Sequence, residues 1–174
     1  MLYAVYRQMG LPFSIVRFFN VYGPRQNPYF VISQSIYKAL RGESPLCYDD
    51  GNQTRCFAYI EDIVKGLLTV SRHPKAIAEA FNLGNPGEFT IKQAIEIILQ
   101  TVGGNLQYKT FVTEKEYGTT YEDIRRRVPK VSKAQELLNW EAEVSFKEGI
   151  QRTVNWAKEN PWWLGDIPVK GKSK

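Results

Sequence analysis

Apolar residues recur at helical spacing in several segments of the chain. Near the start, Leu2, Val5, Tyr6 and Met9 form one such stripe, and Gly10 can end this helix in a left-handed conformation. The same spacing predicts further helices over residues 30–41, 63–70, 90–102, 132–138 and from 145 onward. Three of them begin with the spacing of a capping box, Thr90 with Gln93, Ser132 with Gln135 and Ser145 with Glu148.

Segments rich in β-branched and aromatic residues alternate with these helices. Residues 13–19 predict a buried strand of a parallel sheet, and residues 80–84 predict a second core strand. Residues 46–59, with an Asp-Gly step near the middle, predict a hairpin. Two core strands cannot form a covered parallel sheet by themselves. We therefore expect an upstream segment to supply the rest of the sheet, since the chain also opens inside a helix that has no cap.

Composition narrows the class of protein only slightly. The chain has 174 residues and a net charge of +5, from 23 Lys and Arg against 18 Asp and Glu. The first interpretation of this excess is that the basic residues are dispersed over a solvated surface, and the second is a binding site for a small anion. A nucleic-acid-binding surface is much less favoured than either. Cys47, Cys56 and the single histidine, His73, form neither a disulfide framework nor a zinc ligand set. With no signal peptide and no membrane-length apolar run, we expect reduced thiols in a soluble, cytoplasmic protein.

The most informative stretch is residues 17–25, Arg-Phe-Phe-Asn-Val-Tyr-Gly-Pro-Arg. It resembles the strand-and-loop signature of the NAD-dependent epimerase/dehydratase family, the extended short-chain dehydrogenases/reductases that act on nucleotide sugars. The resemblance continues in order through five further segments, at residues 50–57, 59–62, 81–84, 127–140 and 146–156. Six short motifs in the right order make chance a poor explanation.

The resemblance implies an α/β fold. Residues 1–160 would be the C-terminal, substrate-binding part of a Rossmann-like fold, with the last parallel strands and a small α/β domain. The N-terminal NAD-binding half would be absent, and residues 161–174 would form a flexible basic tail.

The resemblance also assigns a substrate site. Arg55 and Arg127 would clamp the diphosphate of a nucleotide sugar, because a guanidinium offers a planar fork of donors to phosphate oxygens. Asn20 would hydrogen-bond the substrate near its phosphates, and Leu46 and Tyr48 would line the nucleobase pocket. We expect the three polar side chains to converge on one pocket. The alternatives are a surface position for Arg55, a different register among the three consecutive arginines that end with Arg127, and a turn-capping role for Asn20.

Three other residues within the motifs are predicted to be structural. Asp62 lies near a helix start and is expected to act as a cap or hydrogen-bond acceptor rather than as a catalytic acid. Tyr22 and Phe57 are expected in the core.

The parent family uses NAD, but its cofactor and catalytic motifs do not occur in this sequence. There is no Gly-rich turn of the dinucleotide-binding type, and no Tyr is followed by Lys four positions later. Tyr3 and Arg7 have that spacing, but arginine does not replace lysine there. We therefore assign no catalytic residue and expect no cofactor to bind this chain alone. Cys56 and Lys130 also stand where the family usually has Asp, which weakens the anchoring of the neighbouring arginines.

Three hypotheses for function stay open at this point. The first is that the chain is the nucleotide-sugar-binding portion of an epimerase or dehydratase such as a UDP-glucose 4-epimerase, inactive alone, and is either a truncated gene product or one half that works with a separately encoded NAD-binding half. Alternatively, it is a stand-alone module that binds nucleotide sugars or other anions. The third hypothesis is a non-functional remnant of a gene.

Overall fold

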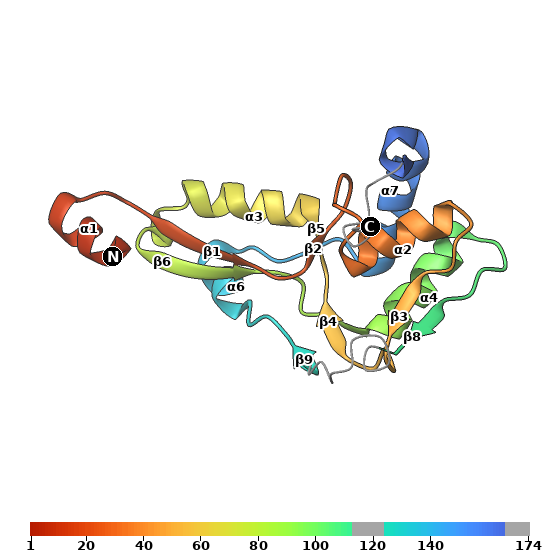
Figure 1. The fold of residues 1–174 in the computed structure, drawn as a ribbon. Coiled ribbons are helices and arrows are strands. Elements are labelled where there is room, and N and C mark those ends of the chain that lie inside the picture. Colours follow the sequence, from red (N-terminus) through yellow and green to blue (C-terminus); the bar gives the residue numbers. More distant parts are fainter. Residues whose placement is uncertain (113–123, 166–174) are drawn as a thin grey trace, which may run out of the picture.

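The computed structural model describes residues 1–112 and 124–165, which form two parts (Figure 1). The first part is built on a parallel pair of strands, β1 (Ser14–Phe18) and β6 (Glu79–Leu83). Helices α3 (Ile60–Arg72) and α6 (Ser132–Leu138) pack against this pair in one apolar core, and α1 (Leu2–Met9) lies beyond one end (Figure 1). A short 3-10 helix, η1 (Pro74–Ala76), precedes β6.

The second part is mainly helical. Helix α4 (Ile91–Val102) packs against both α2 (Val31–Leu40) and α7 (Phe146–Glu159). A parallel pair, β3 (Leu46–Tyr48) and β8 (Lys109–Phe111), borders these helices, and η2 (Pro161–Leu164) follows α7.

Short strands join the two parts. Strand β2 (Val21–Tyr22) pairs in parallel with β5 (Ala58–Tyr59). Strand β4 (Thr54–Cys56) lies between β7 (Glu88–Thr90), to which it is antiparallel, and β9 (Arg126–Arg127), to which it is parallel.

Each part has its own apolar core, and one stretch of chain serves both. Phe57 and Tyr59 belong to the core of the helical part, whereas Ala58 belongs to the core between β6, α3 and α6. This follows from the two-residue alternation of an extended chain, which directs successive side chains to opposite faces. The predicted core positions of Tyr22 and Phe57 are confirmed, since they are 2% and 5% exposed.

Every helix predicted from the sequence is present, and two of the three predicted caps are confirmed. Gly10 ends α1 with φ of 68°, in the left-handed region. Thr90 and Gln93 make both hydrogen bonds of a capping box at the start of α4. The Ser145 hydroxyl accepts a hydrogen bond from the Glu148 backbone N–H at α7. The predicted cap at Ser132 is wrong, because this residue already lies inside α6, which begins after Val131 without a side-chain cap.

The predicted hairpin over residues 46–59 is also wrong. Strands β3 and β4 belong to different sheets, with β3 parallel to β8. The turn between them bonds to a helix instead. The carbonyl oxygens of Gly51 and Gln53 accept hydrogen bonds from the backbone N–H groups of Lys92 and Ile91, at the start of α4. An Asp-Gly step permits a tight turn, but the partners of the flanking strands are chosen by tertiary packing.

Strand β1 is parallel to its partner as predicted, but it is not buried. Within the described residues it pairs with β6 alone, and Phe18 is 53% exposed. A parallel strand is buried only when strands pair with both of its edges and helices cover both faces of the sheet. A sheet of two strands does not meet these conditions. In the described ranges, no helix combines the length and apolar character required to cross a membrane.

Candidate functional site

A cavity of about 420 Å³ lies where the two parts of the fold meet. The segment from the end of β1 through β2 forms one wall, and the start of α2 forms another. Its lining is largely aromatic and aliphatic, with three polar side chains, Asn20, Gln26 and Arg127. A mostly apolar cavity with a few convergent polar groups is the usual form of a small-molecule site.

Asn20 is held in a fixed orientation at this cavity. It lies between β1 and β2 with φ of 39°, in a region that asparagine tolerates better than most residues. Its Nδ2 donates to the Cys56 carbonyl oxygen at 2.8 Å, and its Oδ1 accepts from Nη2 of Arg127 at 2.8 Å. Both ends of the amide are therefore engaged, and the side chain joins the β1–β2 loop to both β4 and β9.

Arg127 brings a positive charge to the cavity. It is the second residue of β9 and is exposed to solvent, while its guanidinium contacts Asn20. A guanidinium has five N–H donors in a planar fork. The contact with Asn20 therefore leaves donors available for an anionic ligand, and the sequence-based expectation that residues 20 and 127 come together is met by the geometry.

Arg55 occupies a neighbouring position but does not line this cavity. Its Cα is paired in register with that of Arg127 across β4 and β9. Its Nη1 donates to the carbonyl oxygens of Thr54 and Ile124, at 2.8 and 2.6 Å. Among the described residues, Arg55 thus helps to fix the segment that leads into β9. Of the three polar residues expected in one pocket, Asn20 and Arg127 line the cavity and contact each other.

Leu46 and Tyr48 lie on β3, apart from the cavity. Both are half-buried, whereas Cys47 between them is buried. The ring of Tyr48 packs edge-on against Phe111 of β8, with centroids 5.3 Å apart. Their assignment to a nucleobase pocket stays a prediction.

Gln26 is a lining residue that sequence reasoning missed. Its Nε2 donates to the Val21 carbonyl oxygen at 2.6 Å, and its backbone carbonyl accepts from Nε1 of Trp163 at 3.1 Å. Its Oε1 is buried and has no hydrogen-bond partner among the described residues. Gln26 follows Gly-Pro-Arg in the loop that leads to α2, and this loop position was the available signal.

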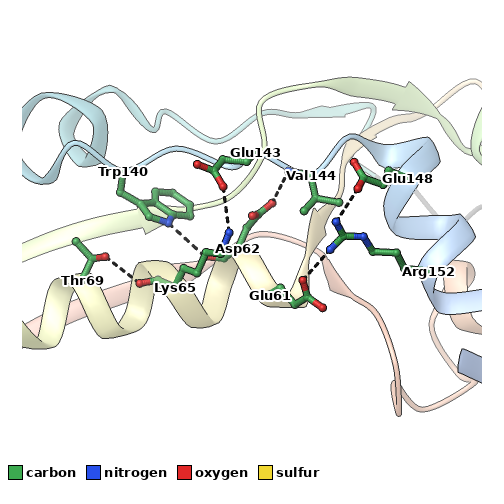
Figure 2. Close-up of polar contacts among 9 residues, drawn as sticks. All are labelled: Glu61, Asp62, Lys65, Thr69, Trp140, Glu143, Val144, Glu148 and Arg152. Atoms are coloured by element: carbon green, nitrogen blue, oxygen red, sulfur yellow. Dashed lines mark hydrogen bonds and ion pairs between the residues drawn. The ribbon is translucent and has the colours of Figure 1, made fainter.

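Asp62 has the structural role predicted for it. This residue, 1% exposed, lies in the first turn of α3, and its Oδ2 accepts from the Val144 backbone N–H at 2.9 Å (Figure 2). The Asp62 carbonyl oxygen accepts from Nε1 of Trp140 at 3.2 Å. Together these contacts fasten residues 140–144 to α3, and Asp62 is not among the residues that line the cavity.

The two cysteines are buried and unpaired with each other. Burial raises the pKa of both the Cys47 and the Cys56 thiols, which keeps them protonated at neutral pH. Within residues 1–112 and 124–165, no cluster of three or more His, Cys, Asp or Glu side chains is placed to hold a metal ion.

Two strand-to-helix junctions among the described residues lack the Gly-rich turn that the parent family uses for its cofactor. NAD requires a Gly-rich turn that leads from a strand into a helix N-terminus, where backbone N–H groups receive the pyrophosphate. In this structure α3 follows β5 directly at Tyr59, and α4 follows β7 directly at Thr90. Neither of these two junctions contains such glycines.

Comparison with known proteins relates the chain to nucleotide-sugar enzymes. Residues 1–153 match the family model described as GDP-mannose 4,6 dehydratase. A UDP-glucuronate 4-epimerase of Thermodesulfobacterium geofontis is 39% identical over 172 residues, covering 96% of this chain and 50% of that protein. A UDP-N-acetyl-alpha-D-glucosaminuronate decarboxylase of Bacillus cytotoxicus is 36% identical over 88% of this chain and 49% of its own length.

Solved structures of nucleotide-sugar epimerases and dehydratases are also similar to this chain. The UDP-glucose 4-epimerase of Thermotoga maritima, solved with UDP-glucose, superposes with a TM-score of 0.79 and 30% identity, covering 92% of this chain and 50% of that one. The dTDP-glucose 4,6-dehydratase of Bacillus anthracis, solved with NAD, gives a TM-score of 0.79 at 27% identity. The chain therefore spans about half the length of the relatives that it matches.

Proposed function

This chain belongs to the GDP-mannose 4,6 dehydratase family of NAD-dependent epimerases and dehydratases, and from that premise we propose that it forms the nucleotide-sugar-binding part of such an enzyme. The single observation that carries the proposal is the contact between Asn20 and Arg127, both of which line a largely apolar cavity. The ligand would be a nucleoside diphosphate sugar, like the UDP-glucose in the Thermotoga maritima structure.

The chemistry of the cavity supports this ligand class. A diphosphate carries negative charge on oxygens that match the guanidinium fork of Arg127, and charge-assisted hydrogen bonds of this kind are among the strongest in proteins. Asn20 fixes one edge of the guanidinium and so orients the remaining donors. The aromatic lining, including Phe18, Phe30 and Phe57, offers apolar surface to the faces of a sugar or base.

Chemistry on the sugar would need residues that this sequence does not contain. When bound, NAD supplies the hydride acceptor for reversible oxidation of a sugar carbon. The Gly-rich turn and the Tyr-x-x-x-Lys pair that serve this reaction in the family are absent from the 174 residues. We infer that a separate polypeptide segment carries them, and that this chain contributes binding and orientation of the substrate.

The surface around β1 supports docking of such a segment. Strand β1 has an edge without a partner strand among the described residues, which is a template for a further strand. Large apolar side chains on the neighbouring elements are between 44% and 59% exposed, namely Leu2, Tyr3, Leu11, Phe18, Val64, Leu67, Leu68 and Ile77. An apolar surface of this extent, next to an open strand edge, indicates a protein interface.

Substitution of Arg127 tests the binding site. We expect Arg127→Ala to raise the Kd for UDP by about 10- to 100-fold, the effect of losing charge-assisted hydrogen bonds to phosphate. Isothermal titration calorimetry on the folded chain measures this directly. Arg72→Ala, on the outer end of α3 and away from the cavity, is the matched control and should leave the Kd unchanged. Equal affinity of the wild type and Arg127→Ala would contradict the proposed site.

An activity assay of the chain alone tests whether the catalytic and cofactor-binding residues lie on a separate segment. Incubated with NAD and UDP-glucose or UDP-glucuronate, the purified chain should give no product sugar nucleotide detectable by ion-exchange chromatography. The full-length Thermotoga maritima epimerase serves as the positive control for UDP-glucose. Conversion by the 174 residues alone would show that they hold a catalytic group which the family motifs do not reveal.

A further inference from the structure

Strand β9 carries Arg127 but consists of only two residues, so its placement depends on contacts made by its side chains. On one side β9 pairs with β4 through residues 126 and 127. Just before the strand, the Arg125 carbonyl oxygen accepts from the Thr54 backbone N–H at 2.9 Å. A ladder this short restrains a segment weakly, because few hydrogen bonds offset its loss of conformational entropy.

Arg126 extends this attachment across the whole three-stranded sheet. Its Nε donates to Oε2 of Glu88 at 3.0 Å, and its Nη2 donates to Oε1 of the same carboxylate at 2.5 Å. Glu88 belongs to β7, the strand on the far side of β4, and the Thr54 hydroxyl of β4 donates to Glu88 Oε2 at 3.0 Å. One carboxylate therefore accepts hydrogen bonds from both of the other strands.

The geometry is of the kind that gives a surface ion pair measurable strength. Most exposed pairs contribute little, but a bidentate guanidinium–carboxylate pair is an exception. Glu88 is the more sheltered partner, with a side chain 30% exposed against 69% for Arg126. The hydrogen bonds from Arg126 also lower the pKa of Glu88, so the carboxylate stays ionised at neutral pH.

We propose that Glu88 and Arg126 form a positioning pair that holds Arg127 at the cavity. Since Arg126 and Arg127 are consecutive residues of an extended strand, their side chains point to opposite faces of the sheet. Arg126 is fixed to Glu88 on one face, and Arg127 thereby reaches Asn20 on the other. This inference rests on the proposed function, in which Arg127 contacts the diphosphate.

The test compares a ligand that has phosphates with one that lacks them. We expect Glu88→Gln to raise the Kd for UDP by about 3- to 10-fold, in the range of one well-formed ion pair, and to leave the Kd for uridine unchanged. NMR titration measures both ligands on the same folded protein. Equal losses for UDP and uridine would indicate general damage to the fold and would overturn the inference.

Two further variants distinguish an effect on the position of Arg127 from an effect of losing a surface carboxylate. The exchanged pair Glu88→Arg with Arg126→Glu should restore UDP binding to within about 2-fold of the wild type, because the ion pair is re-formed. Glu143→Gln removes the acidic partner of Lys65 in another exposed ion pair, away from the cavity, and should leave both Kd values unchanged. Failure of the exchanged pair to restore any affinity would count against the inference.

A readout without ligand keeps the inference distinguishable from the proposed function. Solvent exchange of the Arg127 Nε–H, followed by NMR on arginine-labelled protein, should become faster in Glu88→Gln than in the wild type. If Arg127→Ala weakens UDP binding but Glu88→Gln changes neither exchange nor affinity, the positioning pair is refuted and the site stands. If Arg127→Ala has no effect on UDP, the proposed site fails, whatever the exchange rates show.

Discussion

Replacement of Gly149 by alanine is expected to lower the free energy of unfolding by about 3 kcal/mol, at the upper end of the range for overpacking a core. Gly149 lies on the buried side of α7, and a Cβ atom there would be 2.0 Å from the Tyr22 hydroxyl oxygen and 3.0 Å from the Tyr59 ring. Alanine has the better helix propensity by about 1 kcal/mol, which offsets only part of this clash.

Tyr22 cannot move aside easily, because its hydroxyl is itself engaged. The O–H donates to the Phe146 carbonyl oxygen at 3.1 Å, one turn before Gly149. Burial raises the pKa of Tyr22 far above its ordinary value, so the phenol remains a neutral donor throughout the stability range of most proteins. The ring is also surrounded by Phe57, Tyr59 and Phe146.

Urea denaturation followed by circular dichroism measures this effect, and a second substitution identifies its cause. In a Tyr22→Phe background the hydroxyl is gone, so Gly149→Ala should cost less than it does in the wild type, with an interaction energy of at least about 0.5 kcal/mol. Gln151→Ala, on the exposed side of the same helix, is the control and should change stability by less than about 0.5 kcal/mol. Additive effects at positions 22 and 149 would rule out the steric explanation.

Replacement of Asp62 by alanine is expected to be nearly as damaging, at about 2 to 3 kcal/mol. The substitution removes a buried hydrogen bond and leaves the Val144 backbone N–H buried without a partner, two costs that together fall in this range. Asp62→Asn keeps an acceptor oxygen at the same place and should lose only about half as much.

The adjacent residue provides a matched control for Asp62. Glu61 precedes Asp62 in the first turn of α3 and pairs with Arg152 at 2.8 Å, but its side chain is 55% exposed (Figure 2). Glu61→Ala should therefore cost less than about 1 kcal/mol. Thermal or urea unfolding of the three variants gives the order, and equal losses at positions 61 and 62 would contradict the role assigned to the buried hydrogen bond.

Much of the fold follows from local sequence signals. The helical stripes, the glycine at position 10 and the capping box at Thr90 depend on interactions within a few residues, and the structure has them where the sequence predicts them. The family motifs also predicted the meeting of Asn20 and Arg127, which are 107 residues apart. The spacing of residue types along the sequence, without the family motifs, would not have predicted a contact between two residues so far apart in the chain.

The failures share a physical cause, which is that strand partners are set by tertiary contacts. The Asp-Gly step predicted a hairpin, but β3 and β4 each found a different partner, and the intervening turn bonded to α4. Arg55 was expected in the same pocket but is not among its lining residues; its Nη1 donates to the carbonyl oxygens of Thr54 and Ile124, and its assignment to the diphosphate stays a prediction. The ion pair between Glu88 and Arg126 has no local signature at all, because β7 and β9 meet only through β4.

The alternation at residues 57–59 has a consequence for cooperativity. Because one extended segment forms a wall of both apolar cores, neither core can lose its packing without exposing the segment that seals the other. Two cores with separate walls could open as independent units. Here the shared segment, residues 57–59, couples the free energies of local opening of the two cores. A ligand in the cavity, which Phe57 lines, would hold this segment in place and slow the exchange of amide hydrogens in both cores.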